Sequence, residues 1–436
     1  MAILERVCDI GAGVLLPVAI FLIGAYFTRY LGFFYLRHPL KTAARMIPAE
    51  RRGEALRALS VSLAGTLGVG NIVGVGVAIV LGGAGAIFWM WVSALFSMIL
   101  KYAEIVLAMH YKRYENGKPV GGPTYYMRDG VGGAFGRGMA ACFAALCVFS
   151  AFTMGNMVQM NAAGTAVSSA FGVPRMLFGA VGAIVCCALL ARGFEGISRL
   201  TAVVVPIVSM VFLILCLRVL VIEYARLPAL LLTIVRDAFD VRAASGGAVG
   251  FFLTGAFRQG MAKGAFSHEA GCGTGAMAHA GAGTRYPAVQ GVLGIFEVFF
   301  DTVLLCTVTG LVILLSSEGE PVSENGMHLV IFSFARYYGR RATYFISLAV
   351  MIFALATVVC WGYYGKLCLE YLTRSASASR IYELLYCLSV IPAAMLPETS
   401  VWMLSDLATA LMTVLNLTAV LLLRRVVLAR TKEAGL

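Results

Sequence analysis

The sequence predicts an all-α integral membrane protein with about eleven transmembrane helices. Of its 436 residues, 60% are hydrophobic and only 13% are charged, and the mean hydropathy is +0.87. A soluble domain of this length exposes too much surface to water for such a composition. The apolar residues form runs near or above the ~20 residues that a helix needs to cross a bilayer. Lys and Arg concentrate in alternate connections between these runs, as in multi-pass proteins.

Eleven apolar segments, numbered here in chain order, follow one another along the chain. They cover residues 10–33, 57–81, 84–110, 138–167, 177–194, 199–222, 246–280, 288–316, 341–373, 380–396 and 402–429. The first is long enough to span and lacks a small-residue cleavage site, so we interpret it as a helix and not as a cleaved signal. The whole chain, 1–436, is predicted to form one transmembrane domain.

The distribution of basic residues predicts the orientation in the membrane. Most Lys and Arg lie after segments 1, 3, 5, 7 and 9 and in the C-terminal tail. The positive-inside rule then places the N-terminus outside and the C-terminus in the cytoplasm, in a plasma or inner membrane. This topology, with contact between lipid and the basic loop 34–56, accounts for the net charge of +12. We therefore expect no nucleic-acid partner.

The cysteine and histidine patterns give no reason to expect a cofactor or a bound metal. The 11 cysteines are scattered, mostly within apolar runs, which is typical of small core residues. His268, Glu269, Cys272 and His279 lie close together in segment 7, but their spacing is not that of the H-E-x-x-H zinc motif.

Segment 2 contains a glycine-rich, polar stretch, Gly65 to Gly76, where a regular membrane helix is expected. Lipid offers no water to satisfy freed backbone groups, so such a stretch predicts a broken helix that lines a cavity. Freed N–H groups there suit a carboxylate, and freed C=O groups suit a cation. Close helix packing through small residues is the alternative; it explains Gly74 and Gly76 but not Asn71.

Segment 7 is the second glycine-rich segment, and it begins five spans after segment 2. Segments 2–6 (57–222) and 7–11 (246–429) can therefore be laid over each other with opposite orientation. Such an inverted repeat with interrupted first helices indicates a secondary transporter. Residues 1–56 would then be an added N-terminal helix and its basic loop.

Several other polar residues lie inside apolar segments. Gln159 is an uncharged candidate for the site or for an interhelical hydrogen bond, and Thr357 and Trp361 share one helix face at i, i+4. The alternative for Trp361 is a core indole whose N–H is satisfied. Glu269 needs a partner such as Arg258, Lys263 or a backbone N–H. The remaining charged pairs are Glu297/Asp301, which could relay protons or neutralise basic partners, and Lys101/Glu104 and Lys366/Glu370, which we interpret as structural.

Six motifs along the chain are specific when taken together. They are GTLGVGNIVGVGVAIVLGGAGAIFWMW (65–91), KYAEIVLAMHY (101–111), GGPTYYM (121–127), GNMVQMN (155–161), KGAFSHEAGCGTGAMAHA (263–280) and CWGYYGKLCLEYL (360–372). Through these motifs the chain resembles the alanine or glycine:cation symporter family, also described as sodium:alanine symporters, along nearly its whole length. The family is similar to the leucine-transporter fold. This implies an inverted five-plus-five helix core in segments 2–11.

The resemblance also implies the function and the site. It implies Na⁺-coupled uptake of a small amino acid such as alanine or glycine, with Na⁺ as the coupling ion and membrane lipid as the solvent. The implied substrate contacts are Thr66, Gly70, Asn71, Gln159, Phe266, Thr357 and Trp361. The implied Na⁺ ligands are the carbonyls of Leu67 and Gly70 and the hydroxyl of Thr357.

Four positions depart from the expected family pattern. Ala356 replaces a Ser beside Thr357, His268 replaces an Asn, Thr409 replaces an Asn, and Leu415 replaces a Pro. The first change removes a hydroxyl near the expected ion. Because a His titrates near physiological pH, His268 raises the hypothesis of H⁺ coupling.

We therefore expect a secondary active symporter that imports small neutral amino acids, and not an enzyme. The alternatives are an H⁺-coupled or ion-independent exchanger or channel and, more distantly, an intramembrane enzyme that uses Glu269, His268 or the Glu297/Asp301 pair. The preferred amino acid, the ion stoichiometry and the oligomeric state are left open by the sequence.

Overall fold

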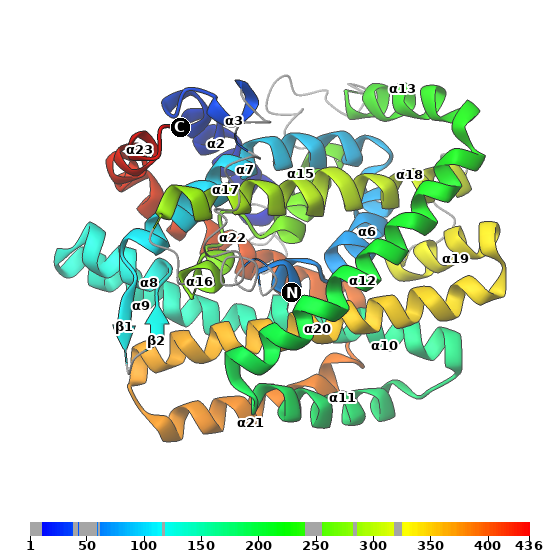
Figure 1. The fold of residues 1–436 in the computed structure, drawn as a ribbon. Coiled ribbons are helices and arrows are strands. Elements are labelled where there is room, and N and C mark those ends of the chain that lie inside the picture. Colours follow the sequence, from blue (N-terminus) through cyan, green and yellow to red (C-terminus); the bar gives the residue numbers. More distant parts are fainter. Residues whose placement is uncertain are drawn as a thin grey trace.

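The computed structural model describes residues 11–37, 42, 59, 62–115, 118–239, 255–281, 286–317 and 325–436. Most of the predicted basic loop 34–56 lies outside the described residues. The described chain is almost entirely helical (Figure 1). Its one described pair of strands is an antiparallel hairpin of β1 (Arg113–Glu115) and β2 (Lys118–Val120).

Helices are present in all eleven predicted segments, and seven of the described helical stretches are long and apolar enough to cross a membrane. This is consistent with an integral membrane protein. In chain order the helices are η1 (Gly11–Leu15), α2 (Leu16–Tyr30), α6 (Val73–Gly82), α7 (Gly85–His110), α9 (Gly133–Ser150), η5 (Ala151–Met157), α10 (Val158–Phe171), α11 (Arg175–Leu190), α12 (Gly193–Ile222), α15 (Gly255–His268), α16 (Thr274–Ala280), α17 (Pro287–Val298), η8 (Phe299–Cys306), α18 (Thr307–Ser316), α20 (Arg340–Thr373), α21 (Ala376–Ala393), α22 (Glu398–Leu422) and α23 (Arg424–Glu433).

Short helices that the apolar pattern did not predict lie between these segments. They are α3 (Phe34–Arg37), α8 (Pro123–Tyr125), η4 (Tyr126–Val131), η6 (Tyr224–Arg226), α13 (Leu227–Ala238) and α19 (Gly326–Tyr338). One of them, α13, stabilises the N-terminus of α7, because the carboxylate of Asp237 accepts a hydrogen bond from the N–H of Gly85 at 2.6 Å. A carboxylate at a helix N-terminus satisfies a free N–H and complements the helix dipole.

The helix of segment 2 is broken, as predicted. Residues 62–66 are helical, Gly68 is extended (φ −103°, ψ −154°), and a short 3-10 turn, η3 (Val69–Asn71), leads into α6. Glycine loses the most conformational freedom in a helix, so a dense glycine stretch yields most easily to a break.

The helix of segment 7 is also broken, as predicted. The chain leaves α15 after His268 and starts α16 at Thr274. Between them Glu269, Gly271 and Gly273 have φ of +51°, +92° and +81°. Glycine adopts such values freely, whereas Glu269 must be held there by its surroundings.

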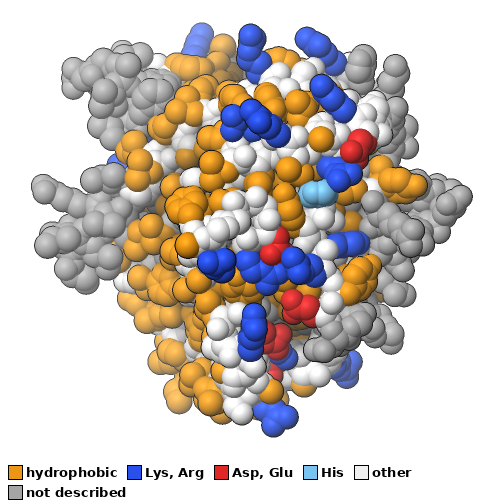
Figure 2. All heavy atoms as spheres, turned by 90° about the vertical axis from the view of Figure 1, so that its left-hand side faces the viewer, with side chains coloured by type: hydrophobic (Ala, Val, Ile, Leu, Met, Phe, Trp, Pro, Cys, Tyr) orange, Lys and Arg blue, Asp and Glu red, His pale blue; other side chains and the backbone are white. Residues whose placement is uncertain are grey.

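Helix α7 forms the centre of the packing, and it contacts both α15 and α17. The N-terminal α2 packs on α7 as well, and a Cβ on Gly24 would lie 2.6 Å from Cβ of Phe96. Small residues allow such close helix contacts in a membrane protein. The hairpin, α8, α9, α16 and α23 gather at one end of the molecule, on the left in Figure 1. Lys and Arg side chains are spread over this end (Figure 2).

Candidate functional site

The two breaks face each other at the contact between Gly70 and Phe266. A Cβ on Gly70 would lie 3.1 Å from two ring carbons of Phe266 and 3.3 Å from Cα of Ser267. A side chain at position 70 would therefore be in tight contact with the helix of segment 7. The structure thus brings together two of the predicted substrate contacts, one from each glycine-rich segment.

Gln159 and Thr357 lie against the break in segment 2. The N–H of Val69 donates to Oε1 of Gln159 at 3.0 Å, and the hydroxyl of Thr357 donates to the carbonyl of Ala64 at 3.0 Å. A Cβ on Gly68 would lie 2.7 Å from both Oε1 of Gln159 and Oγ1 of Thr357. Gln159 follows η5, a π-helical stretch of a kind that is frequent at functional sites.

Trp361 is buried and is held by Glu269. Its indole N–H donates to Oε1 of Glu269 at 2.8 Å, and the hydroxyl of Thr274 donates to Oε2 at 2.6 Å. These bonds hold Glu269 in its left-handed conformation and satisfy the indole N–H, as the alternative interpretation of Trp361 required. The expected Lys263 partner is wrong, because Lys263 pairs with Asp406 at 2.7 Å.

Lys101 pairs with Glu297 at 3.1 Å, not with Glu104, and both side chains are fully buried. The expected pairing of Lys101 with Glu104 is therefore wrong. The expected pairing of Lys366 with Glu370 is wrong as well, because Lys366 pairs with Glu383 at 2.7 Å. A buried cation needs a close counter-charge with satisfied hydrogen bonds, and for Lys101 another helix supplies it.

Glu297 also contacts the half-helices that flank the two breaks. It accepts from the hydroxyls of Ser62 (2.8 Å) and Thr66 (3.3 Å), and its Oε2 lies 3.2 Å from Nε2 of His279. Thr66, predicted to contact the substrate, therefore points its hydroxyl toward Glu297 in this conformation. Lys101 itself also donates to the carbonyl of His268, the last residue of α15, at 3.1 Å.

A second group of oxygens surrounds Asp301, and the sequence did not connect its members. Asp301 accepts from the Nδ2 of Asn71 (2.5 Å), the hydroxyl of Ser267 (2.7 Å) and the hydroxyl of Thr302 (2.8 Å). It pairs with no Lys or Arg in the described part of the chain, and the buried Oδ1 of Asn71 has no hydrogen-bond partner there. The only signal in the sequence was a carboxylate inside an apolar segment.

The side chain of Ala356 lines an apolar cavity of about 250 Å³ together with residues of α11 and α12. Neither Ala64 nor Gln159 lines that cavity. In this conformation position 356, where the family pattern has a Ser, therefore faces this cavity and not the carbonyl of Ala64 and the side chain of Gln159 that lie near Thr357.

His268 is hydrogen-bonded on both ring nitrogens. Its Nδ1 accepts from the N–H of Ala270 at 3.0 Å, and its Nε2 lies 3.2 Å from the hydroxyl of Ser93. Because Nδ1 uses its lone pair, the imidazole is neutral here and carries its proton on Nε2. The neighbouring Cys272 contacts Thr413 instead, at 3.2 Å.

Two interrupted helices that meet at buried polar groups define the class of secondary transporters. The chain belongs to the sodium:alanine symporter family, whose model matches residues 1–434. The family resemblance seen in the motifs is thus confirmed, and the family is one of transporters.

Three relatives illustrate the range of the family. The chain is 35% identical to the sodium/alanine symporter AgcS of Methanococcus maripaludis over 421 residues, which cover 94% of this chain and 91% of the relative. It is 33% identical to an uncharacterised transporter of Haemophilus influenzae, with the same coverage. It is 32% identical to the probable sodium/glutamine symporter GlnT of Bacillus subtilis, over 99% of this chain and 91% of the relative.

Proposed function

We propose that this protein is a secondary active symporter that imports small neutral amino acids, alanine and/or glycine, together with Na⁺. We also propose the inverted five-plus-five repeat, the cytoplasmic C-terminus and a location in the plasma or inner membrane. The basic end of the molecule in Figure 2 supports this orientation, because Lys and Arg favour the cytoplasmic side. The names of the relatives support amino-acid and sodium transport but leave the substrate open.

The observation that carries the proposal is that the side chains of Gln159 and Thr357 occupy the space beside Gly68, where a Cβ would lie 2.7 Å from each. The N–H groups of the broken backbone suit the carboxylate of an amino acid, and the N–H of Val69 now donates to Gln159. Rotation of the Gln159 side chain frees this N–H for a carboxylate. The rings of Phe266 and Trp361 then exclude long side chains, which favours alanine and glycine.

For the cation we propose the oxygens between residues 62–66 and α20. The C-terminal end of a helix carries a partial negative charge, and the carbonyl of Ala64 lies there beside the hydroxyl of Thr357. We propose the carbonyls of Leu67 and Gly70 as further ligands of this cation. The carboxylate of Asp301, with Asn71 and Ser267, offers a second position for a cation because it lacks a basic partner among the described residues.

H⁺-coupled transport is the second candidate. One relative, 28% identical, is a putative sodium/proton-dependent alanine carrier of Bacillus subtilis. A proton on Nδ1 of His268 would break the bond from Ala270, so His268 could act as a carrier only if this part of the chain moves.

The test is uptake of labelled alanine and glycine into proteoliposomes under inward Na⁺, Li⁺ or H⁺ gradients. We expect accumulation with Na⁺, and a loss of at least about tenfold in Gln159→Ala, because the empty site then leaves the N–H of Val69 buried without a partner and the broken backbone loses the side chain that holds it in place. Asn71→Ala is expected to lose activity as well. Asn156→Ala is the matched control, since its amide donates to Tyr386 at 2.9 Å, away from the break. Full uptake in both site variants would remove the site assignment, and uptake driven only by H⁺ would favour the second candidate.

A further inference from the structure

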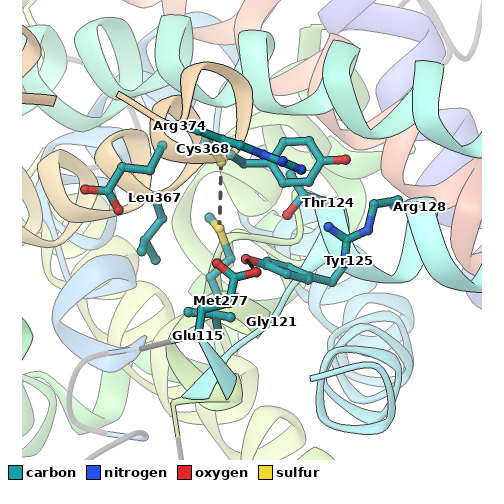
Figure 3. A pocket seen from close by; sticks show the side chains of 12 residues that line it. Glu115, Gly121, Thr124, Tyr125, Arg128, Met277, Leu367, Cys368 and Arg374 are labelled. Atoms are coloured by element: carbon teal, nitrogen blue, oxygen red, sulfur yellow. Dashed lines mark hydrogen bonds between the residues drawn. The ribbon is translucent and has the colours of Figure 1, made fainter. Parts of the chain in front are cut away.

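A cavity of about 260 Å³ lies at the same end of the molecule as the β1–β2 hairpin. Its walls come from the hairpin, α8, η4, α16 and the last turns of α20 (Figure 3). None of the residues predicted for the transport site lines it.

The cavity is lined by charges of both signs. Arg374 makes no ion pair or hydrogen bond through its side chain within the described structure, and the carboxylate of Glu370 is likewise unpaired there. Arg374 follows Glu370 by four residues but is the left-handed residue that caps the C-terminus of α20, and no salt bridge forms between the two. Glu115 lies across the cavity from Arg374 (Figure 3) and accepts a hydrogen bond from the hydroxyl of Tyr125 at 3.1 Å.

The second arginine of the cavity is already engaged. Arg128 donates to Asp129 at 2.8 Å and lies over the ring of Tyr125, 4.9 Å from its centroid. The hydrogen bond from Arg128 lowers the pKa of Asp129 below its usual value, so this carboxylate stays ionised, and it is shared with Arg113, whose Nε lies 2.8 Å from Oδ2. Arg374 is therefore the free cation of the cavity. It also has φ of +52°, which costs energy for a residue with a side chain.

Two residues that line the cavity lie on helices that also reach the buried site. They are Met277 and Cys368, and their sulfur atoms lie 4.0 Å apart. Met277 follows Thr274 by three residues on α16, and Cys368 follows Trp361 by seven residues on α20, which is about 10 Å of helix. Thr274 and Trp361 are the two residues that hold Glu269. The same two helices thus wall the cavity and the transport site.

We propose that this cavity is a second binding site for a free zwitterionic amino acid, between the transport site and the solution on the hairpin side. Arg374 takes the carboxylate, and Glu370 and Glu115 take the ammonium group. The inference rests on the proposed transport function. Movement of Met277 away from Cys368 connects the two sites.

The test compares transport from the two sides of the membrane. Right-side-out and inverted membrane vesicles give the alanine concentration for half-maximal flux from each side. We expect the Arg374→Gln and Glu370→Gln variants to raise this concentration about three- to tenfold from the hairpin side, the loss typical of a partly exposed charged contact. From the opposite side it should change by less than about twofold. Arg380→Gln, an exposed arginine on α21, is the matched control.

The outcomes separate this inference from the transport proposal. Equal half-saturation shifts from both sides, or none, would overturn the second site while leaving transport intact. If the wild type transports no amino acid, binding of labelled alanine to the purified protein is measured instead. Binding that is lost in Arg374→Gln but kept in Gln159→Ala supports the cavity as a binding site. Equal binding in the wild type and in both variants overturns it. If the increase in the half-saturating alanine concentration disappears in vesicles without phosphatidylethanolamine, the cavity binds a lipid headgroup, and the proposal is overturned as well.

Discussion

The buried ammonium group of Lys101 lies 3.1 Å from the carboxylate of Glu297 and 3.1 Å from the carbonyl of His268. Glu297 in turn accepts from Ser62 and lies beside His279. This ion pair therefore links α7 and α17 to the half-helices that flank the breaks in the helices of segments 2 and 7.

Removal of one partner of this pair should destabilise the protein strongly. Lys101→Met leaves the Glu297 carboxylate buried without a full counter-charge, which costs about 3–5 kcal/mol. The double variant Lys101→Met/Glu297→Gln should lose less than the sum of the single variants. Thermal unfolding in detergent measures both. The Lys366–Glu383 pair is more exposed, so Lys366→Met should cost no more than about 1 kcal/mol. Equal losses for the two lysines would contradict this account.

Thr357 should control the response to the cation. Thr357→Val keeps the shape but removes the hydroxyl that contacts the carbonyl of Ala64. We expect the Na⁺ concentration for half-maximal alanine uptake to rise about 5- to 30-fold, as for the loss of ~1–2 kcal/mol. Thr357→Ser keeps the hydroxyl, so its Na⁺ concentration for half-maximal uptake should stay within about threefold of the wild-type value. A Val variant with wild-type Na⁺ dependence would remove Thr357 from the cation site.

Trp361 should position Glu269 through its N–H group. Trp361→Phe keeps an aromatic ring but leaves Oε1 of Glu269 without its donor. A hydrogen bond to a charged group contributes about 1.5–3 kcal/mol, so both unfolding temperature and uptake should fall. Glu269→Gln keeps the size and one acceptor oxygen and should lose less in both measurements. If Trp361→Phe has the stability and uptake of the wild type, the indole serves only as packing.

The glycine pattern predicted the two most important features of the fold. Dense glycines with a polar residue in an apolar segment indicate a break, and both breaks are present near Gly68 and Gly271. The positions of several described helices also followed from hydropathy, such as α20 (Arg340–Thr373) for the predicted segment 341–373, because lipid demands long apolar runs.

The partners of buried charges did not follow from the sequence. Helical spacing suggested Glu104 for Lys101, but the tertiary fold brings Glu297 closer. Asn71 and Asp301 lie 230 residues apart in the chain, so no local pattern connects them. The cavity beside the hairpin was missed for the same reason, since its walls come from three distant parts of the chain.

The most direct test of the central claim compares two glycines of segment 2. A Cβ on Gly68 would lie 2.7 Å from both Gln159 and Thr357, whereas the nearest atom to a Cβ on Gly74 is 3.6 Å away, an ordinary contact. Binding of labelled alanine to the purified protein should be measured with and without Na⁺. We predict Na⁺-dependent binding in the wild type and in Gly74→Ala, and its loss in Gly68→Ala. Undiminished binding in Gly68→Ala would contradict the placement of the transport site.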